Sequence, residues 1–454
     1  MVKVQIAIAS LRDAVITLLP KRSIFPPRIT KFIWTRDFLF PASMWLLSRL
    51  WMGAVMLLIA PHLPALQNGV TPHLGWGIFD AWDSVHYRAI ATEGYEFIND
   101  GKQHNLAFFP LFPVCIFIFM KLGFSFEIAG LIINNLAFLG TLYFLYAWVK
   151  KQCGINAAHW TIAVMAYCPM SLFTGVIYTE GLYLLLSTMA LRAFDEKQYL
   201  WTAICGGMAT ATRPTGMVLI PAFFIAAWKQ NKPLTAYIAG LLSATGLLIF
   251  SVYCELNFHD FLAFIAAQKG WRPSFGFDWE GWLNMFMQIP FGNNWHYGWV
   301  ENDEGGIKDI WYPLFFGLIV IGSSCLLYWR KYFNPLVFYA GYIIVILSLI
   351  IANQDLINNL LNVSMILGSS YLLWYVRQQL TPVMVVYGFC GIGLLLASGG
   401  TISLSRLAYG IVPLNIAIGM WLSRYPRQAY LVLGLFITLL SKLAIGFAQE
   451  LWVG

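Results

Sequence analysis

Apolar runs of about 20 residues, separated by short polar connections, make up most of this chain of 454 residues. An α-helix needs about 20 consecutive apolar residues to cross a bilayer, whereas a barrel strand alternates apolar and polar positions over about 10 residues. We therefore predict an all-α polytopic membrane protein with roughly 11 to 13 transmembrane helices. The predicted membrane segments lie at about residues 38–61, 125–149, 157–177, 179–195, 199–228, 234–255, 311–328, 336–352, 356–376, 382–398, 402–421 and 428–448.

Two longer polar stretches interrupt this pattern and divide the chain. We expect the first to be an outer loop over residues 62–106 and the second to be an outer loop over residues 256–310. The remaining predicted regions are a cytoplasmic or interfacial N-terminal segment over 1–37, a membrane module over 38–255 that carries the first loop, and C-terminal transmembrane helices over 311–454.

The positions of Lys and Arg predict the orientation of the helices. If residues 105–121 crossed the membrane, Lys150 and Lys151 would lie outside, against the positive-inside rule. We therefore predict that this Pro-containing stretch is interfacial or re-entrant, and that 199–228 forms two half-helices broken at Arg213. This topology places the N-terminus in the cytoplasm and both polar loops on the outer face of the plasma membrane.

Composition excludes a soluble globular protein, because only 11% of the residues are charged and 59% are hydrophobic. The net charge of +7 would suggest nucleic acid as a partner of a soluble chain. Here Lys and Arg stand in short clusters between apolar runs, so we expect membrane lipids and no nucleic acid. The 7 Cys are scattered without metal-type spacing and predict neither a disulfide framework nor a metal site.

In the first loop, the stretch FDAWDSVHY concentrates polar side chains among aromatic ones. Asp80 and Asp83 are three residues apart, as are Asp83 and His86, and on a helix each pair would share one face. A positioned carboxylate or imidazole is what removal of a proton from a weakly acidic hydroxyl requires. The pattern predicts a site at the membrane surface; a surface helix with ordinary caps and ion pairs is the alternative.

Two further motifs contain charged residues, one within an apolar run and one at the start of another. Arg213 in ATRPTG stands beside a helix-breaking Pro, which fits an anion-binding junction suited to a phosphate leaving group. An Arg that extends to the interface from a kink is the alternative. Tyr178 and Glu180 open another run, where Glu180 contacts substrate or is simply a first-turn carboxylate favoured by the helix dipole.

Later candidates are weaker by sequence alone. Gln268 and Trp271 precede the C-terminal helices; Trp271 offers an aromatic face for a sugar ring, and an interfacial aromatic belt explains it equally well. Arg406 lies near the outer end of a late segment, where it binds substrate or is a helix-terminus charge. Arg49, inside the first apolar run, is costly in lipid and is expected to face the bundle interior or a wet cavity.

The motifs resemble, in the same order, those of the GPI mannosyltransferase II (PIG-V) family and its bacterial relatives. WDSVHYRAIATEGYEF followed by HNLAFFPLFP is similar to the first-loop signature of that family. The tetrapeptide YTEG at 178–181 resembles its YSES element, with Thr and Gly in place of the serines, and ATRPTG resembles its ATRxxG element. The stretch from Leu262 to Trp271 and the pair Ser405-Arg406 are similar to bacterial members.

The resemblance implies a GT-C glycosyltransferase, a bundle of transmembrane helices whose first outer loop carries a catalytic Asp. Such enzymes use a polyprenyl- or dolichyl-phosphate sugar and invert the anomeric carbon. It implies that Asp83 is the general base, that His86 assists acceptor or phosphate binding, and that Arg213 binds the donor phosphate. Further substrate contacts are predicted from Glu180, Tyr178, Asp80, Gln268, Trp271 and Arg406.

The predicted reaction moves a hexose, mannose by analogy, from a polyprenyl-phosphate donor to a lipid or glycan acceptor on the outer face. The lipid phosphate leaves as a monoester, so we expect no cofactor and no obligatory metal. A transporter or flippase of lipid-linked sugars is the alternative, but it predicts inverted repeats and charges near the midplane, whereas the polar residues here cluster in outer loops. A non-catalytic subunit of a transferase complex would tolerate the loss of Asp83.

Overall fold

The computed structural model describes residues 36–65, 69–272, 275–292, 295, 311–328, 335–352 and 354–454. Nearly all of the predicted N-terminal segment and the second loop beyond residue 295 therefore lie outside the described residues. Within these ranges the chain is helical and has no strand, apart from an isolated β-bridge between Gly276 and Ser398.

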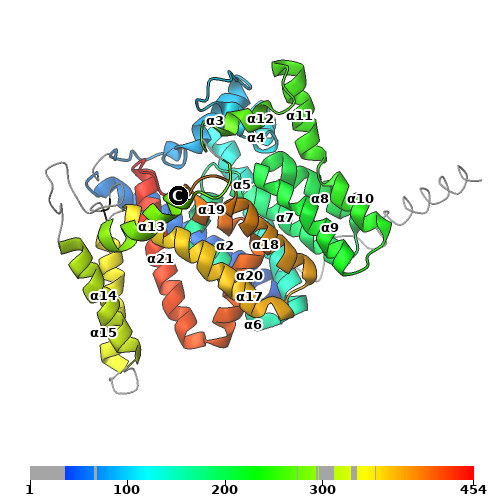
Figure 1. The fold of residues 1–454 in the computed structure, drawn as a ribbon. Helices are drawn as coiled ribbons and strands as arrows, with labels where there is room; N and C mark the ends of the chain where they lie inside the picture. Colours follow the sequence, from blue (N-terminus) through cyan, green and yellow to red (C-terminus); the bar gives the residue numbers. More distant parts are fainter. Residues whose placement is uncertain are drawn as a thin grey trace, which may run out of the picture.

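The helices follow one another along the chain as coloured in Figure 1. The first half contains α2 (Arg36–Ala54), α3 (Asp83–Thr92), α4 (Leu111–Lys121), α5 (Phe126–Cys153), α6 (Ile155–Tyr167), α7 (Glu180–Asp195), α8 (Tyr199–Thr212), α9 (Leu219–Lys229), α10 (Leu234–Leu242) and α11 (Thr245–Phe258). The second half contains α12 (Ala263–Gln268), α13 (Trp279–Phe291), α14 (Trp311–Tyr328), α15 (Pro335–Ile351), α16 (Gln354–Val363), α17 (Ser369–Val376), α18 (Pro382–Leu396), α19 (Leu404–Tyr409), α20 (Val412–Arg424) and α21 (Pro426–Ala448). Short 3-10 segments join several of them, namely η5 (Asn105–Ala107), η6 (Pro169–Thr174) and η7 (Pro214–Val218).

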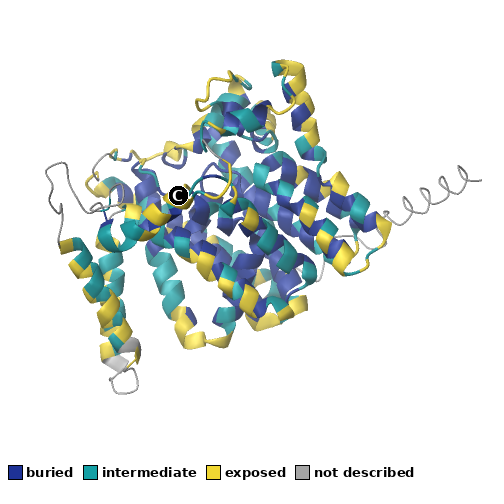
Figure 2. Cartoon of the chain, viewed as in Figure 1, coloured by how far each residue is buried: buried dark blue, intermediate teal, exposed yellow. Residues whose placement is uncertain are grey.

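The core is a bundle in which α5 packs against α6 and α7, α7 against α8, and α6 against α20. Its largest fully buried side chains include Trp148, Phe138, Phe194 and Tyr409. Figure 2 shows this buried centre, with exposed residues at the outer helices and at the rims. The helices α14 and α15 form a pair beside the bundle and reach it through α13 and α21.

Five helical segments among the described residues are long and apolar enough to cross a membrane: Asp37–His62, Phe126–Cys153, Leu234–Phe258, Gln354–Gln379 and Pro426–Ala448. Shorter apolar helices accompany them, and large apolar side chains such as Leu58, Ile249 and Leu318 are exposed, as lipid contact requires. The all-α polytopic membrane architecture is confirmed, and the chain is an integral membrane protein.

The predicted break at Arg213 is confirmed, and the helix within 105–121 is too short to span the membrane. The helix α8 ends at Thr212, Arg213 has an extended backbone, and Pro214 begins η7 before α9 continues. The pyrrolidine ring of Pro214 disfavours helical geometry at the residue before it, so the break falls where the motif placed it. The helix α4 contains 11 residues, which extend about 16 Å and cannot cross a hydrocarbon core of about 30 Å.

Two predicted membrane segments are interrupted instead of continuous. The segment predicted at 157–177 is α6 followed by η6, which begins at Pro169. The segment predicted at 402–421 is α19 followed by α20, which has Pro413 in its first turn. Proline lacks the backbone N–H that a continuous helix needs and fits the first turn of a new one, so each proline separates two shorter elements.

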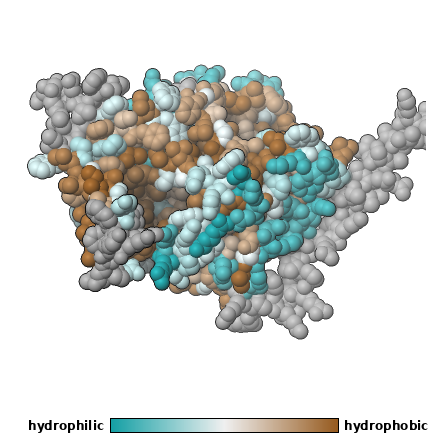
Figure 3. Space-filling model, turned by 60° about the horizontal axis from the view of Figure 1, so that its bottom comes forward, coloured by the Kyte–Doolittle hydropathy of each residue, from teal (hydrophilic) through white to brown (hydrophobic). Residues whose placement is uncertain are grey.

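Charged side chains predicted to share the cytoplasmic side do gather at one end of the bundle. Lys150, at the end of α5, pairs with Asp37 at the start of α2 at 2.6 Å, and Lys151 pairs with Glu196 after α7 at 3.3 Å. The face that includes the bottom of Figure 1 carries a hydrophilic band beside a hydrophobic region (Figure 3).

The opposite end is covered by α3, α4 and α12 (Figure 1). A second apolar cluster, separate from the bundle core, holds this cover together. It contains Leu106 and Phe109 from the AFFPLFP region, Phe250 from α11 and Phe264 from α12. The cover places the first polar loop over the ends of α7, α8 and α19.

Candidate active site

Four charged side chains from distant parts of the sequence meet beneath this cover. Arg406 Nη2 donates to Asp83 Oδ2 at 2.8 Å, and Arg213 Nη1 donates to Glu180 Oε1 at 2.5 Å. Arg406 Nε lies 3.1 Å from the same Glu180 oxygen, so Arg406 links the two carboxylates. The side chains are buried, with exposed fractions of 7% for Asp83, 1% for Glu180, 9% for Arg213 and 11% for Arg406. The structure therefore joins four predicted site residues in one ionic cluster.

Asp83 is held at the first position of α3 by a strained turn. Trp82, the residue before it, has φ of 61°, a left-handed value that is unusual for a bulky residue. Tyr178 supports this turn, because its hydroxyl accepts from the Asp83 backbone N–H at 3.3 Å and donates to Ala81 O at 3.4 Å. Strained backbone of this kind is concentrated at functional sites. Tyr178 thus contacts the backbone that positions the carboxylate.

Glu180 is positioned by Asn134, a fully buried residue of α5. Asn134 Nδ2 donates to the carbonyls of Phe173 and Val176, and its Oδ1 accepts from Gly181 N at 2.7 Å. A Cβ at Gly181 would lie 2.2 Å from the Asn134 backbone oxygen, so only glycine allows this approach. Asn134 is not among the site residues predicted from the motifs, although an Asn within an apolar run was a usable signal.

Arg406 is positioned by two contacts that act on the segment before it. Asn362 Oδ1, from α16, accepts from Ser405 N at 2.8 Å. Arg272 donates to Ile402 O at 2.8 Å, to Gly400 O at 3.3 Å and to Ser398 Oγ. Burial, together with the neighbouring Arg406, lowers the pKa of Arg272 to about 10, so its guanidinium remains charged at neutral pH.

The cluster has an excess of positive charge and hydrogen-bonding groups without partners. Two carboxylates, Asp83 and Glu180, balance Arg213 and Arg406. Arg272, whose guanidinium is close enough to Arg406 for the two charges to interact, has no carboxylate partner among the described residues. Among the described residues, Arg406 Nη1 is buried and has no acceptor, and Glu180 Oε2 is buried and has no donor. A buried guanidinium N–H without an acceptor is costly, so the arrangement suits an anionic ligand.

His86 lies on the same face of α3 as Asp83 and belongs to an aromatic group. Its ring stacks on Phe108 with centroids 4.6 Å apart and meets Trp271 edge-on at 5.3 Å. Burial lowers the pKa of His86, opposed by the nearby charge of Asp83. The indole N–H of Trp271 is buried without an acceptor in the described part of the chain. Gln268 donates to Ala107 O at 2.7 Å and so fastens α12 to η5.

The prediction that Asp80 shares a helix face with Asp83 is wrong. Asp80 precedes α3, which begins at Asp83, and its carboxylate accepts from Ser84 Oγ at 2.6 Å and pairs with Arg88. Arg88 also pairs with Glu127 of α5 at 2.7 Å. Asp80 therefore fastens α3 to the bundle through an ion-pair network.

The prediction for Arg49 is confirmed. Its guanidinium faces the bundle interior and donates to Thr174 Oγ1 at 3.1 Å and to Ser171 O at 3.5 Å.

Among the described residues no three His, Cys, Asp or Glu side chains come together as a metal site.

Known proteins match this chain over its first part. Residues 56–270 match the family described as Mannosyltransferase (PIG-V), just under half of the sequence. The chain is 27% identical over 151 residues to GPI alpha-1,6-mannosyltransferase 2 of Homo sapiens, and 26% identical over 156 residues to the protein of that name from Rattus norvegicus. These matches cover 31% and 32% of this chain but only 29% and 30% of the curated relatives. The predicted resemblance to the PIG-V family is confirmed.

Two solved structures illustrate the partial similarity in shape. The oligosaccharyltransferase of Archaeoglobus fulgidus in the apo form has a TM-score of 0.46 at 11% identity, over 93% of this chain and 57% of that one. ArnT from Cupriavidus metallidurans bound to undecaprenyl phosphate has a TM-score of 0.46 at 12% identity, over 90% of this chain and 63% of that one.

Proposed function

We propose that this protein is a membrane glycosyltransferase that moves mannose from a polyprenyl-phosphate donor to a hydroxyl of a lipid or glycan acceptor on the outer membrane face. The observation that carries the proposal is the buried Arg406 Nη1, which lacks an acceptor in the described part of the chain and has the further guanidinium of Arg272 nearby. A lipid phosphate supplies both an oxygen that accepts a hydrogen bond from Arg406 Nη1 and a negative charge that compensates the guanidinium groups. The match to the PIG-V family over 56–270 supports mannose as the sugar.

In the proposed reaction Asp83 is the general base. Arg406 binds Oδ2 of Asp83, which leaves Oδ1 to accept the proton of the acceptor hydroxyl. The acceptor oxygen attacks the anomeric carbon from the side opposite the phosphate, so the configuration inverts. The bond from that carbon to the phosphate oxygen breaks, and its electron pair stays on the lipid phosphate.

The guanidinium groups stabilise the leaving group. Arg213 and Arg406 lie in a buried site, where a fixed positive charge offsets the charge that develops on the phosphate more effectively than water does. We assign Arg213 to the donor phosphate, with Glu180 holding both guanidinium groups in place. His86 is largely neutral at pH 7, because its pKa is lowered, and it assists the acceptor hydroxyl as a hydrogen-bonding group.

Transfer from radiolabelled polyprenyl-phosphate mannose tests the proposal. Purified protein in lipid nanodiscs is given a panel of membrane lipid acceptors, with and without EDTA. We expect turnover in wild type that EDTA does not change, and a loss of about 10²- to 10⁴-fold in Asp83→Asn.

The matched control is Asp100→Asn in the same loop, whose carboxylate contacts exposed Lys102 and part-buried His104 outside the cluster. It should keep the wild-type rate. Equal rates for wild type and Asp83→Asn would show that Asp83 is not the base. Movement of the donor across proteoliposome membranes without transfer would favour the transporter alternative.

A further inference from the structure

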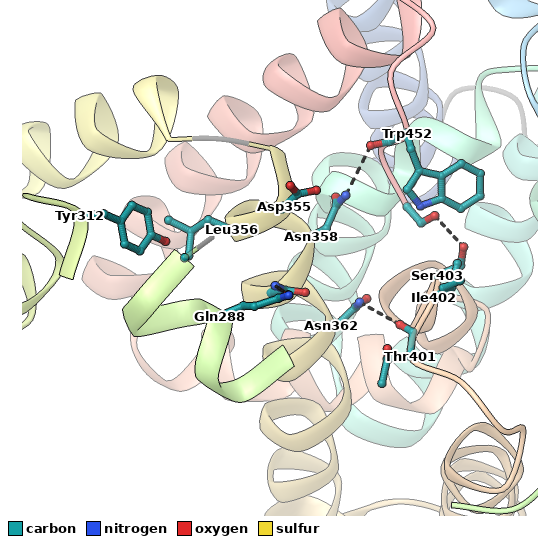
Figure 4. A pocket seen from close by; sticks show the side chains of 13 residues that line it. Gln288, Tyr312, Asp355, Leu356, Asn358, Asn362, Thr401, Ile402, Ser403 and Trp452 are labelled. Carbon is teal, nitrogen blue, oxygen red and sulfur yellow. Dashed lines mark hydrogen bonds between the residues drawn. The ribbon is translucent and has the colours of Figure 1, made fainter. Parts of the chain in front are cut away.

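A polar cavity of about 300 Å³ lies beside the ionic cluster, in the part of the chain that the PIG-V match does not reach. It is bounded by α13, by α16, by the segment before α19 and by the C-terminal residues (Figure 4). The lining side chains that matter here are Gln288, Asp355, Asn358, Asn359, Asn362 and Trp452.

The sequence of α16, QDLINNLLNV, creates this polar wall. Asp355, Asn358, Asn359 and Asn362 are spaced so that they share one helix face. The opposite face places Ile357 in the apolar core with an exposed fraction of 1%. Such a row of carboxamides in a predominantly apolar helical segment is costly unless polar groups meet it, and polar residues of this kind mark substrate sites.

Within the described part of the chain, protein partners satisfy only part of the hydrogen-bonding capacity of this wall. Asn359 Nδ2 donates to Gln288 Oε1 at 3.1 Å, Asn358 Nδ2 to Trp452 O at 3.4 Å, and Asn362 Nδ2 to Thr401 O at 3.1 Å. Asn358 Oδ1 accepts from Gln354 Nε2 at 3.1 Å, and Asn362 Oδ1 accepts from Ser405 N at 2.8 Å. Each carboxamide has two N–H groups and an oxygen with two lone pairs. Several donors and acceptors therefore remain for a ligand that offers both, as hydroxyl groups do.

The charge of the cavity excludes a phosphate. No Lys or Arg is among its described lining residues, and its charged side chain, Asp355, would repel an anion. The carboxamides can donate to and accept from hydroxyl groups, the carboxylate can accept from them, and the ring of Trp452 offers an apolar surface. This combination fits an uncharged sugar.

The cavity is joined to both ends of the Asp83–Arg406 pair. Asn362 in its wall binds Ser405 N, next to Arg406. Trp452, in the opposite wall, packs edge-on against Trp82, next to Asp83, with centroids 5.1 Å apart. A sugar held here would therefore lie beside the proposed base.

We propose that this cavity binds the neutral sugar headgroup of the acceptor and presents its hydroxyl to Asp83. The assignment rests on the proposed function, because it takes Asp83 as the site of transfer. The donor carries its sugar directly on a phosphate and needs the guanidinium side of the cluster. The acceptor sugar needs no cation, which matches a wall of carboxamides.

Saturation-transfer NMR with methyl α-D-mannopyranoside tests the site without turnover, using the full chain in nanodiscs. We expect wild type to give a signal above that of empty nanodiscs. Asn359→Leu, which keeps the side-chain size, should weaken binding about fivefold to tenfold, the effect of one hydrogen bond. The less disruptive Asp355→Asn should weaken it as well. The matched control is Asn257→Leu, on the exposed surface of α11, which should bind as wild type does.

Undecaprenyl phosphate, measured with the same proteins, separates acceptor from donor. Asn359→Leu should bind it normally, whereas Arg213→Gln should lose affinity for it and keep the mannoside signal. The proposal is overturned if wild type gives no specific mannoside signal, if Asn359→Leu equals wild type, or if undecaprenyl phosphate displaces the mannoside. If transfer assays fail while this crossed pattern holds, the sugar cavity stands and only the proposed reaction falls.

Discussion

The guanidinium of Arg406 holds the carboxylate of Asp83 across 323 positions of sequence, with Nη2 donating to Oδ2 at 2.8 Å. Because Arg406 also lies 3.1 Å from Glu180, one residue of α19 fixes two carboxylates from two other helices. The pair therefore links the first loop to the C-terminal helices.

A double-mutant cycle measures this link. Removing one partner of a buried ion pair leaves the other charge unpaired and costs about 3 to 5 kcal/mol. We expect Asp83→Asn and Arg406→Gln each to lower the thermal stability in detergent, and the double variant to lose less than the sum, with a coupling of about 1 to 3 kcal/mol. Additive losses would mean that the two side chains do not interact in the folded protein.

We expect Arg213→Gln to weaken binding of the donor much more than binding of the acceptor. The variant removes a charge-assisted hydrogen bond to phosphate, worth about 1.5 to 3 kcal/mol, so the KM for polyprenyl-phosphate mannose should rise about tenfold to a hundredfold. Initial rates at varied donor concentration give this value. The matched control is Arg192→Gln. Arg192 lies in the last turn of α7, at the end away from Glu180, and pairs with Glu196. This variant should leave the donor KM unchanged.

Gly181→Ala is expected to destabilise the protein by about 1 to 3 kcal/mol through overpacking. The new Cβ would lie 2.2 Å from Asn134 O and 2.5 Å from Asn134 Oδ1, so α5 and α7 must separate. Gly393→Ala, in α18 with no atom within 4 Å of its Cβ, should be neutral or slightly stabilising. Thermal unfolding in detergent compares the two; equal melting temperatures would contradict the close approach.

The lowered pKa of His86 predicts a pH dependence of stability. The unfolded chain binds a proton near the ordinary pKa of about 6.5, whereas the folded protein binds it only at lower pH. The stability that neutral His86 contributes to the folded protein is present above about pH 6.5. It is lost as the pH falls through the pKa of His86 in the folded protein. Wild type should therefore lose more stability on acidification than His86→Phe, which keeps the aromatic contact with Phe108. Thermal unfolding across this pH range compares wild type with His86→Phe. Equal losses of stability in the two proteins would show that His86 is not buried in its neutral form.

Local chemistry was sufficient for the class of the protein and for its irregular segments. The apolar runs determined that the chain is a helical membrane protein, because backbone groups in lipid must be paired within the helix. Pro214 determined the break between α8 and α9, since its ring disfavours helical geometry at Arg213. The motifs also selected Asp83, Glu180, Arg213 and Arg406 as polar residues worth examining.

Only the tertiary structure decided how these residues combine. Ion pairs between α3, α7 and α19 depend on how helices pack, and no sequence spacing encodes a contact across 323 positions. For the same reason Asp80 pairs with Arg88 and does not lie beside Asp83 on one helix face. Packing also places the polar face of α16 against α13 and the C-terminal residues, where it lines a cavity. The sequence supplied the charges and the carboxamides; packing decided which of them face one another, because burial makes each polar group depend on the partner that the fold brings to it.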